Sequence, residues 1–195
     1  MRKSHAAVCA AWLLIAATFM APTAPAAGDD GAATLRVAIG GPFELVDQNG
    51  EVRSDSDFRG QFMLVYFGYN WCPDICPTTL WQVSAALDRL GEQAGQVQPI
   101  YITVDPERDT VDSMKYYASH FHPSLVALTG SQAQIADVAS AYQVEYAKSG
   151  NVDGDDYYVD HTAYVFLMDP SGNFLRLFSH EALAEEIASG VLDFM

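Results

Sequence analysis

The stretch FMLVYFGY, Phe62 to Tyr69, is a continuous apolar and aromatic run, and it is followed almost at once by WCPDICP, Trp71 to Pro77. A run of this kind is typical of a strand buried on both faces of a sheet. Beyond Pro77, apolar residues recur at helical spacing along one stripe, at Leu80, Val83, Leu87 and Leu90. The sequence therefore predicts a central strand that turns sharply into a helix, with Cys76 at or near the helix start.

Strand and helix patterns alternate along the rest of the chain. The strand patterns are a hairpin around a QNG turn at residues 41–52, single strands at 99–105 and 124–128, and a hairpin at 163–179. The helical patterns lie at 110–121, where Thr110 opens the helix, from Ser131 onward, and at 181–192. Ser131 and Gln134 have the spacing of a capping box. The acidic stretch at 149–160 is predicted to be a loop.

This order of elements, β-α-β-α and then β-β-α, has no internal repeat. It predicts an α/β fold, a thioredoxin-like sandwich with an N-terminal β-hairpin extension. In such folds the reactive residues lie at the carboxyl end of a central strand and the start of the next helix. That is the predicted position of Cys72 and Cys76.

The N-terminal segment has the pattern of an export signal. Arg2 and Lys3 precede an apolar run from Ala6 to Met20, and small residues follow up to an Ala-x-Ala at 24–26. We interpret residues 1–27 as a signal peptide or N-terminal anchor and 28–40 as a flexible lead. Residues 41–195 are then the thioredoxin-like domain, for which a metal-binding role is argued from its cysteines. The protein is then expected to be periplasmic or exported, with a tether to the inner membrane as the alternative.

The chain is strongly acidic, with a formal net charge of -15. Removing the signal would take away two cations and no anion, which lowers this charge to -17. An acidic surface argues against nucleic acid and anionic membranes as partners. The same cleavage would remove Cys9, so that the mature chain keeps only Cys72 and Cys76.

Two cysteines separated by three residues at a helix start have three possible roles. Helix amide dipoles and unpaired N–H groups stabilise a thiolate there, and the spacing aims both sulfurs to the same side. A structural disulfide is disfavoured, because so short a loop removes little entropy from the unfolded chain. Thiol redox chemistry and metal binding remain.

A metal site needs a further ligand, and His161 is the candidate. His120, His122 and His180 fall at helix ends or after a hairpin strand, where surface or capping roles are the default. His161 lies at the entrance of the strand 163–168, which can approach the cysteine loop in a thioredoxin-like fold; position alone leaves a purely structural role open. If the three converge, two thiolates and one imidazole suit copper(I), and a fourth oxygen would serve copper(II), whereas structural zinc prefers four protein ligands.

Four segments, in this order and spacing, resemble the Sco/SenC family of thioredoxin-like copper chaperones for cytochrome c oxidase assembly. They are GYNWCPDICPTTL, YITVDPERDT, LTGS and YYVDHTAYVFLMDPSGNF, and the likeness runs from about Phe43 to the C-terminus. The resemblance implies that Cys72, Cys76 and His161 bind Cu(I) or Cu(II). It also implies that the protein is a metallochaperone and not an enzyme. Such a protein would deliver copper to the copper-bearing subunit of the oxidase or to another periplasmic copper protein, or would reduce the cysteines of the binuclear copper centre.

The alternative function is that of a periplasmic thiol-disulfide oxidoreductase in which Cys72 and Cys76 are the redox-active pair. Trp71 stands where the family pattern has a smaller or polar residue, and a Trp-Cys pair is typical of thiol oxidoreductases.

Two carboxylates near the proposed ligands each have two possible roles. Asp74 either tunes the thiolate charge or is a solvated turn residue, and Asp160 either orients the His161 ring or is exposed.

Overall fold

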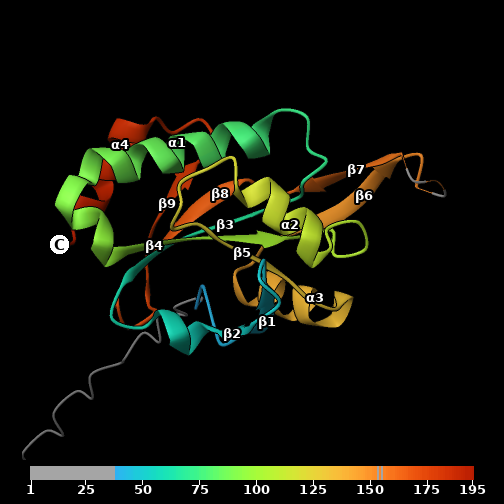
Figure 1. The fold of residues 1–195 in the computed structure, drawn as a ribbon, viewed down its shortest axis with the longest axis horizontal. Helices are drawn as coiled ribbons and strands as arrows, with labels where there is room; N and C mark the ends of the chain where they lie inside the picture. Colours follow the sequence, from blue (N-terminus) through green and yellow to red (C-terminus); the bar gives the residue numbers. More distant parts are fainter. Residues whose placement is uncertain (1–37, 153, 155) are drawn as a thin grey trace, which may run out of the picture. The chain divides into compact units, whose positions relative to one another are not determined.

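The computed structural model describes residues 38–152, 154 and 156–195, which belong to one compact unit. Within them, seven strands form one sheet in the order β2-β1-β5-β4-β3-β8-β9 (Figure 1). The bounds of these strands are β1 Glu44–Asp47, β2 Val52–Ser54, β3 Phe62–Gly68, β4 Val97–Thr103, β5 Val126–Thr129, β8 Tyr164–Met168 and β9 Phe174–Ser179. Strands β3, β4 and β5 are parallel, and the other pairs are antiparallel.

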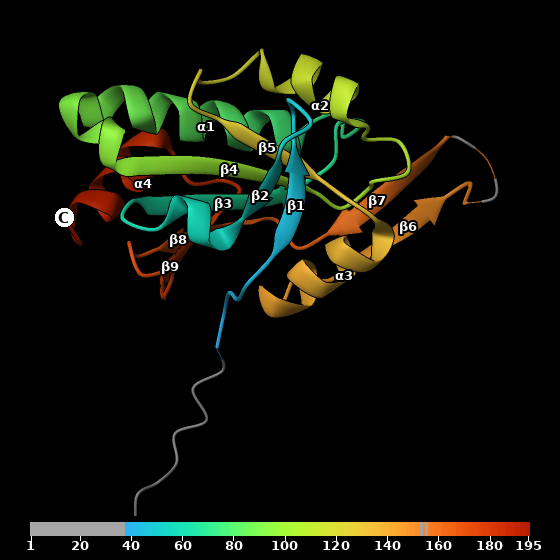
Figure 2. The same cartoon turned by 60° about the horizontal axis from the view of Figure 1, so that its bottom comes forward.

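Helices cover both faces of this sheet. The four α-helices of the described part are α1 Ile75–Leu90, α2 Val111–Ala118, α3 Gln132–Ala141 and α4 Ala184–Leu192. Helices α1, α2 and α4 lie on one face and α3 on the other (Figures 1 and 2). The parallel strands require crossover connections, which α1 and α2 supply. The predicted thioredoxin-like α/β sandwich is therefore confirmed.

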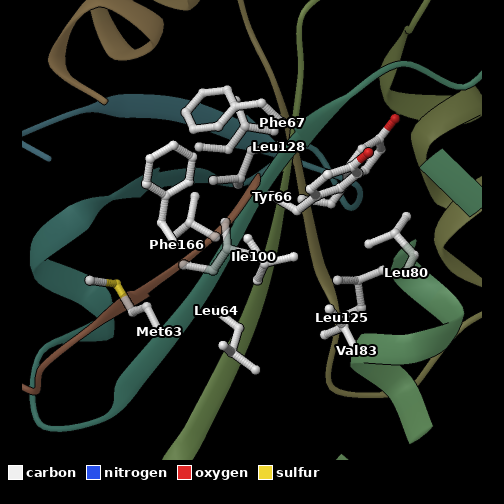
Figure 3. Close-up of a cluster of buried hydrophobic side chains, with 14 of the residues drawn as sticks. Met63, Leu64, Tyr66, Phe67, Leu80, Val83, Ile100, Leu125, Leu128 and Phe166 are labelled. Atoms are coloured by element: carbon white, nitrogen blue, oxygen red, sulfur yellow. The ribbon is translucent and has the colours of Figure 1, made fainter. Parts of the chain in front are cut away.

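Strand β3 is the centre of the core, and all seven of its residues are buried. Tyr66 and Leu64 point toward the face covered by α1, near Leu80 and Val83 of that helix, and Phe67 points to the opposite face (Figure 3). There the Phe67 ring lies 5.3 Å from that of Tyr142 and 6.1 Å from that of Phe166. Burial of each such side chain stabilises the folded state by about 1.5–3 kcal/mol. A continuous apolar run therefore indicates a strand with both faces buried, and this prediction is confirmed for β3.

The predicted N-terminal hairpin is present as β1 and β2, and it extends the main sheet. The Asp47 carboxylate accepts hydrogen bonds from the backbone N–H groups of Asn49 and Glu51, at 2.8 and 3.1 Å. Gly50 has φ of 83°, which favours glycine at this turn position. Strand β1 also pairs antiparallel with β5.

Helix starts follow the predicted capping residues. The Thr110 side chain caps α2 by accepting a hydrogen bond from Ser113 N–H, and Ser131 and Gln134 form the expected capping box at α3.

The prediction of a loop at 149–160 is wrong at both ends of that stretch, at 149–150 and 157–160. A second, two-stranded sheet is formed there by β6 (Tyr146–Gly150) and β7 (Tyr157–His161). In β7, Tyr157 and Val159 are buried while Tyr158 and Asp160 are exposed, so the strand has one face against the protein. This hairpin projects beyond the main sheet (Figures 1 and 2) and brings His161 back toward it at the end of β7.

The signal or anchor predicted for residues 1–27, and most of the lead at 28–40, lie outside the described residues. Among the residues that are described, no helix has both the length and the apolar character needed to cross a membrane.

Candidate metal centre

The two cysteines lie where β3 ends and α1 begins, as predicted. Cys76 is the second residue of α1, and its backbone N–H lies 3.5 Å from Cys72 Sγ. Both thiols are free and buried; Cys72 is 9% exposed and Cys76 is fully covered. The outer sulfur is therefore Cys72 and the inner one Cys76.

His161 is the third residue at this place. Its Nε2 lies 3.3 Å from Cys76 Sγ. Its Nδ1 lies 3.1 Å from the carbonyl oxygen of Thr162, and because a carbonyl only accepts, Nδ1 carries the proton. Nε2 then faces the Cys76 thiol, and it is the ring nitrogen that a metal ion held by the cysteines would take. The ring is oriented by Thr162, whereas the side chain of Asp160 is exposed.

The two thiols have very different proton affinities. A hydrogen bond from Cys76 lowers the pKa of Cys72 to about 4, with further help from His161 and from backbone N–H groups, against the opposing effect of burial. The bond to Cys72 and burial raise the pKa of Cys76 well above its usual range. Asp74 occupies the N-cap position of α1 without a side-chain capping bond, and its contribution to the Cys72 thiolate is through its backbone. The pair shares one proton, and Cys72 is the thiolate.

Aromatic rings and a glycine shape the space around Cys76. The rings of Tyr66 and Tyr69 lie 6.3 and 6.0 Å from the His161 ring, both edge-on. Burial, followed by the nearby Cys76, raises the pKa of Tyr66, so that its hydroxyl stays protonated. At Gly68, the last residue of β3, a Cβ would lie 2.9 Å from Cys76 Sγ. The sulfur therefore occupies the space that a side chain at Gly68 would fill.

A buried carboxylate fixes the loop that leads to the cysteines. Asp109 is fully covered, and its Oδ2 accepts hydrogen bonds from Asn70 N–H at 3.0 Å and from the Thr103 hydroxyl at 2.6 Å. Burial raises the pKa of Asp109 to about 6. Because Asn70 lies two positions before Cys72, this bond ties the cysteine loop to the end of β4.

The other predicted residues have the ordinary roles expected of them. His120 Nδ1 lies 2.9 Å from the Tyr116 carbonyl at the end of α2, and His122 Nδ1 lies 2.7 Å from the Ser124 hydroxyl. His180 follows β9. The sequence did not predict a role near the site for three residues. These are Gly68, Asp109 and Arg108, whose guanidinium lies near the rings of Tyr69 and Trp71.

The donors are close together but not yet arranged around an ion. Within residues 38–195, leaving aside 153 and 155, no group of three or more His, Cys, Asp and Glu side chains is arranged to hold a metal ion.

The family model described as SCO1/SenC matches residues 31–195. The SCO2-like protein RP587 of Rickettsia prowazekii is 40% identical over 177 residues, which cover 90% of this chain and 86% of that protein. The mitochondrial SCO2 homolog of Bos taurus is 44% identical over 162 residues, and there the match covers 82% of this chain and 61% of the bovine protein.

Solved structures give the same result. ScoI of Bradyrhizobium japonicum with copper bound has a TM-score of 0.75 and 44% identity, covering 81% of this chain and all of that one. BsSco, a member of the Sco family of cytochrome c oxidase assembly proteins in which a disulfide switch was identified, has a TM-score of 0.64 and 26% identity, covering 80% and 92%. The protein belongs to the SCO1/SenC family.

Proposed function

We propose that this protein is a copper chaperone in which Cys72, Cys76 and His161 bind Cu(I) or Cu(II). The observation that carries the proposal is the 3.3 Å contact between Cys76 Sγ and His161 Nε2, with Cys72 Sγ beside the backbone N–H of Cys76. Thiolate and imidazole are soft and borderline donors that suit copper. The copper-bound structure of the Bradyrhizobium japonicum relative supports the choice of metal.

The proposed transfer of copper to an acceptor follows from the small number of protein ligands around the ion. Three protein donors leave copper open to an incoming thiolate, so the ion can pass to an acceptor by exchange of one ligand at a time. Oxidation of the Cys72–Cys76 pair to a disulfide would remove two of the three donors. We propose that the acceptor is the binuclear copper centre of cytochrome c oxidase, on the resemblance to a family of oxidase assembly proteins, and that the protein acts outside the cytoplasm.

The test is a titration of the purified, reduced protein with Cu(I) and with Cu(II), read by competition with a chelator and by absorption. The expected result is tight binding of one copper, with thiolate-to-copper charge-transfer bands for Cu(II) that disappear in Cys72→Ser. A protein that binds neither ion tightly would refute the chaperone function.

A second function is favoured by the asymmetry of the thiols. Cys72 is the more exposed sulfur and has the lowered pKa, which suits a nucleophile, and the buried Cys76 suits a resolving thiol. The Cys72 thiolate would attack one sulfur of a target disulfide and release the other as a thiolate. Cys76 would then displace the target from the mixed disulfide, so that the pair becomes oxidised and the target reduced. Rapid exchange with a disulfide substrate by the metal-free protein tests this function.

A further inference from the structure

The hairpin β6–β7, which carries His161, is held to the protein by the connection after β4. Arg108 Nη1 donates a hydrogen bond to the carbonyl oxygen of Tyr157, at 3.0 Å, and the Tyr157 hydroxyl donates to Asp105 Oδ1, at 2.8 Å. Lys148 and Glu107 add an ion pair at 2.6 Å. Since β6 and β7 pair with each other and not with the main sheet, these contacts position the hairpin together with the burial of Tyr157 and Val159.

Arg108 is the best buried cation among these contacts. Its side chain is 15% exposed, and it forms an ion pair with Asp105, whose side chain is 2% exposed. The guanidinium carbon also lies 3.6 Å from the centre of the Tyr157 ring. The Lys148–Glu107 pair, by contrast, is 37% and 45% exposed, and exposed pairs contribute little. The polar contacts that position β7 are therefore mainly those among Asp105, Arg108 and Tyr157.

The same guanidinium faces the cysteine loop. It lies 5.8 Å from the centre of the Tyr69 ring and 5.9 Å from that of Trp71, the residue before Cys72. The Tyr69 ring in turn contacts His161 edge-on at 6.0 Å. Arg108 thus contacts both elements that supply the proposed ligands: the loop with the cysteines and the strand that ends at His161.

We propose that Arg108 is a positioning residue for the copper site, setting the distance between His161 and the cysteine loop. It acts through Tyr157 on the strand that ends at His161, and does not itself contact copper. A planar guanidinium with several donors can pair with Asp105, bond the Tyr157 carbonyl and lie on aromatic rings at the same time, and lysine cannot. The part of this inference that concerns copper rests on the proposed function.

The first test measures copper affinity in Arg108→Gln and Arg108→Lys. Loss of a residue that orients a metal ligand typically weakens metal binding by about 10- to 100-fold, and we expect that loss in Arg108→Gln and a smaller one in Arg108→Lys. In a His161→Ala background, where no imidazole needs positioning, Arg108→Gln should leave the affinity unchanged. Equal weakening in both backgrounds, or none in either, would overturn the proposal.

The second test needs no metal. Hydrogen exchange of the metal-free protein should show faster exchange of the amides of β7 in Arg108→Gln and unchanged exchange in β3. The control is Arg89→Gln, which makes the same chemical change at an exposed pair with Glu185, between α1 and α4. Unchanged exchange in β7 would contradict the proposal. If wild-type protein binds no copper while β7 loosens in Arg108→Gln, the chaperone function fails and the role of Arg108 in holding the strand stands.

Discussion

Cys76 Sγ and His161 Nε2 lie 3.3 Å apart although 85 positions separate them in the chain. The contact joins helix α1, which follows the central strand, to strand β7, which belongs to the separate two-stranded sheet. Cys76 is placed by the turn from the central strand into α1, and His161 is placed by a hairpin outside the main sheet. The geometry of the site therefore depends on how the hairpin packs, since Cys76 of α1 and Tyr157 and Val159 of β7 all belong to the buried core.

Substitution of His161 by alanine separates the two candidate functions. His161→Ala removes a direct ligand, so copper affinity should fall by more than about 100-fold, the upper end of what a lost orienting residue costs. The exchange of the Cys72–Cys76 pair with disulfides should continue. Chelator competition measures the first quantity and a disulfide-exchange assay the second.

The control for that variant is His122→Ala, because His122 contacts Ser124 and lies outside the site. Its copper affinity should equal that of the wild type. A His161→Ala protein with wild-type affinity would show that His161 is not a ligand.

Gly68 is predicted to be required for the position of Cys76. In Gly68→Ala the added Cβ would meet Cys76 Sγ at 2.9 Å and the Tyr101 ring at 3.1 Å, and neither side chain has free space to move, because both are fully covered. Overpacking of this kind costs about 1–3 kcal/mol of unfolding free energy, and copper affinity should fall as well. Denaturant unfolding of the reduced, metal-free protein measures the first effect.

Gly95→Ala is the matched control, since no atom lies within 4 Å of a Cβ built there. A Gly68→Ala protein as stable as Gly95→Ala would mean that the cysteine turn relaxes at little cost.

The central strand, the helix after it and the capped helices can be predicted from the sequence because their signals are local. An apolar run, a helical stripe and a Ser131–Gln134 box each lie within a few residues. The approach of His161 to the cysteines was expected only as a possibility of the fold, since it depends on how β7 packs. The alternation of buried Tyr157 and Val159 with exposed Tyr158 and Asp160 was a signal of that strand that acidic and glycine residues nearby obscured.

Arg108 and Asp109 show why the rest of the site was missed. In the sequence both belong to a charged turn, DPERDT, and a turn of this composition is usually solvated. In the structure Asp109 is fully covered and Arg108 is mostly so. Burial of a charge depends on its partners, here Asp105, Thr103 and Tyr157, and these are brought together only by tertiary packing.

The thiols are predicted to react unequally. At about pH 6 the Cys72 thiol, with a pKa of about 4, is a thiolate, whereas Cys76 is covered and protonated. Iodoacetamide should therefore modify Cys72 first, as peptide mass spectrometry would show. In Cys76→Ala, which removes this donor, the alkylation of Cys72 should titrate at a higher pH, because the hydrogen bond from Cys76 is the largest cause of the lowered pKa. Equal rates at both cysteines in the wild type would contradict this assignment.

Asp109 gives the fold a pH dependence of defined sign. Burial raises the pKa of this carboxyl from 3.8 to about 6, against the hydrogen bonds from Thr103 and Asn70, which lower it. Between about pH 4 and pH 6 the carboxyl is protonated in the folded state and ionised in the unfolded state, so the folded state binds more protons. The contribution of Asp109 to stability is therefore greatest below about pH 4 and is lost as pH rises through 6. The full difference is roughly 3 kcal/mol.

Asp109→Asn removes this titration and keeps an oxygen that can accept from Asn70 and Thr103. The unfolding free energy of the wild type, measured relative to Asp109→Asn, should therefore fall as pH rises from about 4 to about 6 and then level off. Taking the difference cancels the groups that titrate in both proteins. A difference that stays constant over this range would mean that Asp109 has its ordinary pKa, and that the hydrogen bonds from Asn70 and Thr103 offset its burial.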